Sequence, residues 1–159
     1  MEELSGAEVE QRVAVLKRFR ALLTMQRDRF RVYLETLDHQ KNLIEKGSAE
    51  ELCAHVELEE RIVGDIISIQ KTIEPMRALY EFTWKGGGSL SVPEIPKIEE
   101  TITNLKTEAG LRWERNKALL EERMSAIRTE LSELRASPYR RRRSSYPNAP
   151  APSMIDIKG

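Results

Sequence analysis

The sequence contains few of the residues that build catalytic or metal centres. Its 159 residues include one cysteine, Cys53, two histidines, His39 and His55, and only 6% aromatic residues. A single cysteine excludes a disulfide and a thiolate metal cluster within the chain, and a reducing compartment is the simpler assumption. No apolar run approaches roughly 18 residues, and the N-terminus is acidic, so neither a membrane span nor a secretory signal is predicted. We therefore expect a cytoplasmic protein.

Sequence motifs for catalysis and metal binding are also missing. Cys53 and His55 are two positions apart, and such residues do not face each other on a helix, so a cysteine–histidine nucleophile is not expected. Di-iron bundles use Glu-x-x-His, but Thr36 precedes His39 at that spacing and Leu52 precedes His55. The two histidines and one cysteine are too few for a zinc site. We expect no enzyme, no cofactor and no metal site.

The most regular feature of the chain is an apolar residue at every seventh position near its start. The repeat predicts one helix of about 40 residues with a seam that other helices must cover. Ser5 with Glu8, and Ser48 with Glu51, fit capping boxes at two helix starts. We therefore predict helices over 6–46 and 49–84, joined so tightly that they form an antiparallel hairpin. The repeat consists of Val9, Leu16, Leu23, Phe30, Leu37 and Ile44.

The end of the second predicted helix is marked by a proline and several aromatic residues. Pro75 should kink this helix or end it near Glu74, because proline lacks an amide hydrogen and its ring clashes with the preceding turn. Tyr80 and Phe82 are interpreted as a plug that closes one end of the bundle. Trp84 could belong to this plug or to a binding surface.

A linker over 85–96 separates the hairpin from a third predicted helix over 97–136. Its glycines lack the Gly-Lys-Ser/Thr of a phosphate loop, so the linker is interpreted as a hinge. The apolar pattern of the third helix changes register near Gly110, so we expect different faces to be buried on either side of Gly110. The fold class is thus all-α, an elongated bundle or coiled coil formed by residues 1–136. The second half of this helix carries six apolar residues, here called the C-terminal stripe: Trp113, Leu120, Met124, Ile127, Leu131 and Leu134.

Residues 137–159 form a proline-rich tail that we expect to be disordered. The tail has five basic residues and one acidic residue, a net charge of +4, and the whole chain is neutral, which leaves −4 on the body. An acidic body does not indicate a nucleic-acid-binding domain. The tail offers a candidate docking segment, with a solubilising tail as the alternative interpretation. The candidate residues are Arg140, Arg141, Arg142, Arg143, Met154, Ile155 and Ile157.

Several segments of the hairpin resemble the FlgN-like flagellar export chaperones. The matching segments are Leu16–Leu23, Tyr33–Glu35, Ile44–Gly47, Glu57–Val63 and Gln70–Pro75, and the last, Gln-Lys-Thr-Ile-Glu-Pro, is the most particular. The resemblance covers roughly residues 10–135, and the arginine run and the Met-Ile-Asp-Ile end of the tail depart from it.

The resemblance implies a non-enzymatic chaperone that keeps hook–filament junction subunits soluble and delivers them to the type III export gate. Such chaperones bind the amphipathic C-terminal segment of the client through their own C-terminal helix, here the C-terminal stripe. Two alternatives remain open at this point. One is a structural coiled coil, such as a homodimer, whose seam is covered by another copy. The other is an adaptor that binds an anionic partner through the arginine tail.

Overall fold

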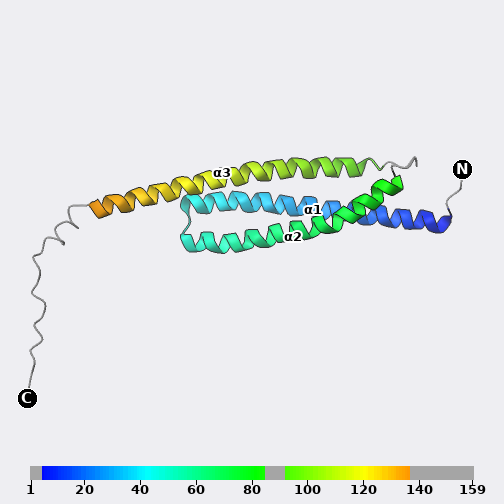
Figure 1. The fold of residues 1–159 in the computed structure, drawn as a ribbon, viewed down its shortest axis with the longest axis horizontal. Coiled ribbons are helices and arrows are strands. Elements are labelled where there is room, and N and C mark those ends of the chain that lie inside the picture. Colours follow the sequence, from blue (N-terminus) through cyan, green and yellow to red (C-terminus); the bar gives the residue numbers. More distant parts are fainter. Residues whose placement is uncertain (1–4, 85–91, 137–159) are drawn as a thin grey trace, which may run out of the picture. The chain divides into compact units, whose positions relative to one another are not determined.

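The computed structural model describes residues 5–84 and 92–136. They form three helices and no strand: α1 (Gly6–Lys46), α2 (Ala49–Trp84) and α3 (Glu94–Ala136) (Figure 1). The all-α fold class is therefore confirmed, and the bounds of α1 and α2 agree with those expected from the sequence. The predicted linker lies partly, and the tail entirely, outside the described residues.

Both capping boxes are present and explain where α1 and α2 begin. The Ser5 hydroxyl accepts a hydrogen bond from the Glu8 amide at 3.4 Å, and the Glu8 carboxylate accepts one from the Ser5 amide at 2.8 Å. Ser48 and Glu51 exchange the same pair of bonds at 3.1 and 2.9 Å. Each box satisfies two amides that the first helical turn leaves without a partner.

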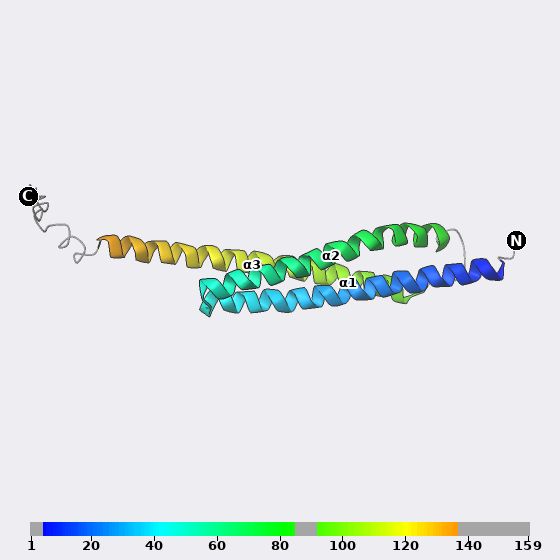
Figure 2. The ribbon, with the colours of Figure 1, turned by 90° about the horizontal axis from the view of Figure 1, so that it is seen from below.

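A very short connection joins α1 and α2 into an antiparallel hairpin (Figures 1 and 2). Gly47 ends α1 in an extended conformation, with φ −84° and ψ 170°, and its amide donates to the Leu43 carbonyl at 2.8 Å. A β-carbon at Gly47 would lie 2.8 Å from the same carbonyl oxygen. The chain can therefore pass this close to the end of α1 because residue 47 has no side chain.

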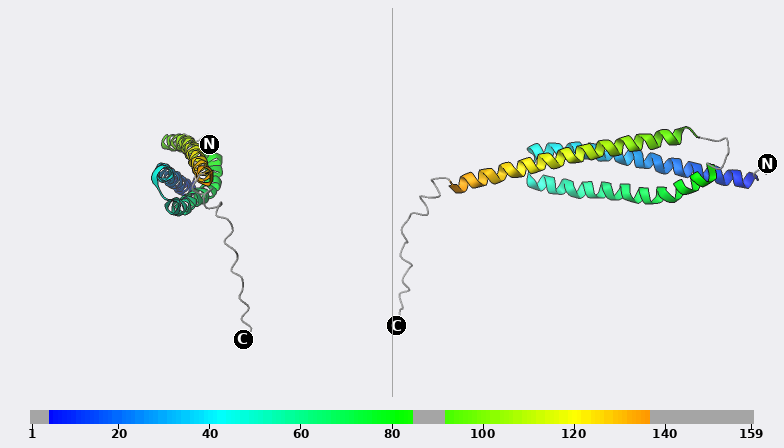
Figure 3. Two further views of the ribbon diagram at one scale, coloured as in Figure 1. Left: turned by 90° about the vertical axis from the view of Figure 1, so that its left-hand side faces the viewer. Right: turned by 45° about the horizontal axis from the view of Figure 1, so that its top comes forward.

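Pro75 does not end α2, which continues to Trp84. The ribbon of α2 bends in this part of the helix (Figure 3), as a helix does where proline removes a hydrogen bond and its ring crowds the preceding turn. Of the two outcomes expected at Pro75, the termination is not observed, and the bend of the α2 ribbon agrees with a kink.

The third helix begins three residues earlier than the sequence predicts, at Glu94 instead of Lys97. The Ile95 amide donates to the Val92 carbonyl at 3.2 Å, and the Ile95 side chain is only 1% exposed. Pro96 fits in this first turn because amides there need no partner within the helix. The start of α3 was predicted too late because the prediction did not take the burial of Ile95 into account.

Residues 1–120 form one unit whose core is shared by all three helices. Phe19, Leu23 and Leu37 of α1 and Ile73 of α2 are fully covered, and Ile102 of α3 packs into the same region as Phe19 and Ile73. The α1 repeat is thus buried as expected from Leu23 through Ile44. Val9 is an exception at 45% exposed, so the sevenfold pattern begins before the core does.

The prediction that Tyr80 and Phe82 close the end of the bundle is confirmed for Tyr80 and wrong for Phe82. Tyr80 is partly buried and its ring stacks on Phe19, with 5.0 Å between ring centroids. Phe82 is 87% exposed, so it plugs nothing in this unit. The two side chains lie two positions apart on α2 and therefore point in different directions.

Residues 121–159 form the second unit, of which the structure describes 121–136. These sixteen residues are helical, and all except Arg123 are exposed. In neither described stretch, 5–84 or 92–136, is any helix long and apolar enough to cross a membrane.

Two glycines should respond in opposite ways to substitution by alanine. Gly64 is exposed within α2, and a β-carbon there would meet nothing within 4 Å. We expect Gly64→Ala to raise the free energy of unfolding by about 0.5–1 kcal/mol. Gly47→Ala should lower it by about 1 kcal/mol or more, because the new carbon collides with the Leu43 carbonyl. Urea denaturation of both variants measures this, and equal effects of the same sign would contradict the interpretation of the turn.

Candidate functional site

The C-terminal stripe is largely exposed along α3. Trp113, Met124, Ile127 and Leu131 are 45–50% exposed and Leu134 is 65% exposed, whereas Leu120 is half-buried. Monomeric proteins rarely leave a row of large apolar side chains in water without a binding role. The stripe is therefore the candidate functional site.

The buried face of α3 is a different row of residues. Ile95, Ile102, Ala109 and Asn116 recur every seventh position and are 1–5% exposed. This row continues through Gly110 without a change of face, so the expected switch at that residue is wrong. Instead the buried row turns from apolar to polar at Asn116. Trp113 precedes Asn116 by three residues, which places the stripe roughly 60° around the helix from the buried row.

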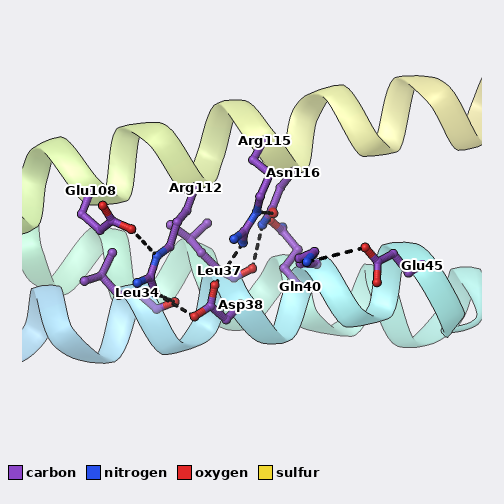
Figure 4. Close-up of polar contacts among 10 residues, drawn as sticks. Leu34, Leu37, Asp38, Gln40, Glu45, Glu108, Arg112, Arg115 and Asn116 are labelled. Carbon is purple, nitrogen blue, oxygen red and sulfur yellow. Dashed lines mark hydrogen bonds and ion pairs between the residues drawn. The ribbon is translucent and has the colours of Figure 1, made fainter.

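Asn116 holds α3 on α1 through its side-chain amide. The amide nitrogen donates to the Leu37 carbonyl at 2.7 Å and to Gln40 Oε1 at 2.9 Å (Figure 4). Asn116 is 2% exposed. A buried amide without partners costs more than its bonds contribute, so these two bonds fix how α3 is rotated at this level.

Two arginines that precede Asn116 on α3 reach the same carboxylate on α1. Arg112 contacts Asp38 at 2.7 Å, the Leu34 carbonyl at 3.2 Å and Glu108 at 2.9 Å, and Arg115 contacts the other Asp38 oxygen at 3.0 Å (Figure 4). The side chain of Asp38 is half exposed, so each ion pair adds little to stability. Together they keep the polar side of α3 against α1 at this level.

The polar contacts extend from α3 through α1 to α2. Gln40 accepts from Asn116 and donates to Glu59 Oε2 at 2.6 Å. The Tyr33 hydroxyl donates to Glu59 Oε1 at 3.2 Å. Burial, followed by the neighbouring negative charge of Glu59 and this hydrogen bond, raises the pKa of Tyr33 to about 12. The tyrosine therefore remains a neutral donor at physiological pH.

His55 is buried beside these contacts. It is 4% exposed, and neither ring nitrogen makes a hydrogen bond to a described residue. Its ring lies 5.2 Å from that of the exposed His39, measured between centroids. Burial, together with the charge of His39, lowers the pKa of His55, while Glu59 and the Thr36 backbone act in the opposite direction.

A shallow groove between α1 and α3 leads to the first residue of the stripe. Phe30 and Tyr33 line it from α1, and Gly110, Leu111 and Trp113 line it from α3. The Lys117 ammonium lies 5.4 Å from the centre of the Trp113 ring. An apolar side chain of a partner helix could enter this groove where the stripe begins.

Sequence reasoning missed the buried polar residues, although each lies in a sevenfold row with apolar residues. His55 shares its row with Ile62 and Ile69, and Asn116 shares its row with Ile102 and Ala109. This spacing was the signal in the sequence that could have predicted their burial.

The candidate tail residues 140–143, 154, 155 and 157 lie outside the described residues. Within residues 5–84 and 92–136 there is no group of three or more histidine, cysteine or acidic side chains that could hold a metal ion.

A protein of Treponema pallidum (strain Nichols), described as an uncharacterized protein, is 37% identical to this chain over 134 residues. The alignment covers 84% of each of the two chains. This chain belongs to the same family as the Treponema protein. No family model matches the chain. No solved structure matches it either.

Asn116 should matter more for stability than the more exposed charges around it. We expect Asn116→Ala to lower the free energy of unfolding by about 1–3 kcal/mol, because it leaves Gln40 without its donor and opens space in the core. Arg115→Ala, on the preceding residue, removes an exposed ion pair with Asp38 and one donor to Asn116 Oδ1 at 3.1 Å, but neither buried bond of the amide nitrogen, so it should cost less than Asn116→Ala. Urea denaturation measures both, and a larger loss for Arg115→Ala would contradict the role given to Asn116.

The lowered pKa of His55 predicts a specific pH dependence of stability. The unfolded chain binds a proton near pH 6.5, the ordinary histidine value, whereas the folded chain binds it only at lower pH. Stability is therefore full above about pH 6.5 and falls below it, until the pH has passed the folded-state pKa. The free energy of unfolding should fall between about pH 8 and about pH 5 more steeply in the native protein than in His55→Phe. Equal slopes would show that His55 does not contribute.

Proposed function

We propose that this protein is a cytoplasmic export chaperone of the FlgN-like kind, without enzymatic activity. Its clients would be hook–filament junction subunits, bound through their amphipathic C-terminal helices and delivered to the type III export apparatus. The observation that carries the proposal is the exposed row of large apolar residues on α3 from Met124 to Leu134, which the half-buried Leu120 precedes. The groove beside Trp113 supports it.

The stripe has the form that helix-in-groove recognition requires. Met124, Ile127, Leu131 and Leu134 follow one another at spacings of three and four residues, so they lie on one face of the helix. A client helix with apolar residues at the same spacing can insert them between these side chains. Long exposed side chains such as methionine adapt to more than one partner surface, which suits a chaperone with several clients.

The arrangement of the polar contacts also supports the proposal. Asn116, Arg112 and Arg115 bind α1 from the buried side of α3. A client that covers the stripe need not displace them. The client-binding face and the folding of the hairpin are therefore separable, which permits a sharp test by mutation.

Ile127→Asp should weaken client binding strongly without unfolding the protein. Ile127 is 46% exposed, so aspartate there costs the folded chain little but places a charge in the proposed interface. We expect affinity for C-terminal peptides of hook–filament junction subunits from the same organism to fall at least about tenfold in titration calorimetry.

Ala126→Asp is the matched control, because it makes the same kind of change one residue earlier, at an exposed position off the stripe. It should bind peptide as the native protein does, and both variants should keep their helical circular dichroism. Native affinity in Ile127→Asp would remove the stripe from client binding. Absence of peptide binding by the native protein would overturn the proposed function itself.

A further inference from the structure

The charges beside the C-terminal stripe form a pattern that complements itself. Along one edge of the stripe the residues at every seventh position are Glu114, Glu121, Arg128 and Arg135, all at least partly exposed. The edge is acidic in its first half and basic in its second half. Two copies of such an edge attract each other when they run in opposite directions.

We propose that the C-terminal stripe is an interface between two copies of this chain, paired as an antiparallel coiled coil. The inference stands apart from the proposed function, although a client and a second copy would compete for the same residues. It rests on three observations: the spacing of the apolar residues, their exposure, and the charges on the edge.

The apolar residues alone set a register for the pair. In coiled-coil terms Met124 and Leu131 occupy the a positions, and Leu120 and Ile127 occupy the d positions. In an antiparallel pair each a residue lies against a d residue of the other copy. Placing Met124 against the second copy's Ile127 also places Leu120 against the second copy's Leu131. Every one of the four central layers is then apolar.

The same register pairs every charge on the edge with its opposite. Glu121 meets Arg128 of the second copy, and Glu114 meets Arg135 of the second copy, each pair occurring twice by symmetry. If one copy slides by a heptad in one direction, Arg128 lies against Arg128 of the second copy. If it slides in the other direction, Glu121 lies against Glu121 of the second copy. Both contacts join like charges. The charges therefore select the register that the apolar layers already favour.

A parallel pair fits less well. It would place Lys117 against the second copy's Lys117 inside the seam, and Arg123 opposite the second copy's Arg128. The favourable contact of Glu130 with the second copy's Arg135 offsets only the second of these. Buried like charges are strongly unfavourable, and flanking like charges add to the cost. In the antiparallel pair Lys117 instead lies at each end of the seam, beside Leu134, where its ammonium can remain in water.

A charge exchange in the full-length protein tests the proposal. Sedimentation velocity over a concentration series should show a dimer of the native chain. Glu121→Arg alone and Arg128→Glu alone should each weaken dimerisation about tenfold, because each creates two like-charge contacts. The double variant Glu121→Arg/Arg128→Glu should restore it to within about twofold, because the pairs are re-formed with reversed signs.

Three results would overturn the proposal. The native chain could remain monomeric over the whole series, the double variant could fail to recover, or Arg128→Glu alone could tighten the dimer, as a parallel pair requires. Circular dichroism must show that each variant is as helical as the native chain. None of these substitutions removes an apolar residue of the stripe, so client peptides should still bind them, which separates this result from a failure of the proposed function.

Cross-linking checks the direction independently. With Cys53→Ser as background, Lys117→Cys combined with Leu134→Cys should form an intermolecular disulfide, because these positions are opposed in the antiparallel pair. Leu134→Cys alone should not, since its two copies would lie at opposite ends of the seam. Efficient cross-linking by Leu134→Cys alone would indicate a parallel pair and would contradict the proposal.

Discussion

The rotation of α3 about its own axis, fixed by the Asn116 amide on α1, is the constraint on which the functional surface depends. Asn116 is 2% exposed and donates to the Leu37 carbonyl and to Gln40. Turning α3 away from this position would bury that amide without partners, at a cost of about 1–3 kcal/mol. Because Trp113 lies three residues earlier on the same helix, its direction follows from the direction of Asn116. A buried polar contact thus decides the direction of Trp113, the first residue of the stripe.

Polar residues in the core also restrict how the helices can slide past one another. An apolar sevenfold repeat packs almost equally well after a shift of seven residues, so it defines the register of two helices poorly. The bond between Gln26 and Gln70, and the contacts of Gln40 and Tyr33 with Glu59, form in only one register. These side chains contribute modest stability. Their larger effect is to make every shifted register leave buried groups unpaired.

The helices of the hairpin could be predicted almost to the residue, because capping boxes are local signals and the sevenfold repeat is long. Other features depend on tertiary contacts that no local pattern contains. The early start of α3 at Glu94 follows from the burial of Ile95. Phe82 is exposed because α1 contacts the face of α2 that carries Tyr80, and Phe82 points in another direction. The burial of His55 was not predicted, although the residue shares a sevenfold row with Ile62 and Ile69. The candidate stripe could be found from spacing alone, whereas its separation from the buried row required Asn116 to be located.

The proposed client and the proposed second copy make compatible demands on one surface. Four central apolar layers give a short seam, and short coiled coils are weak dimers, since each layer must offset the entropy of ordering two helices. A weak dimer protects the stripe from nonspecific association when the chain is concentrated, yet a longer client helix can displace it. The edge charges then select the register of the pair and add little to its stability. Exposed ion pairs contribute little energy, whereas like charges brought together in a shifted register oppose pairing. A client helix with the same edge pattern, acidic residues followed by basic ones, would be favoured in the same direction as a second copy, while its apolar residues would supply most of its affinity.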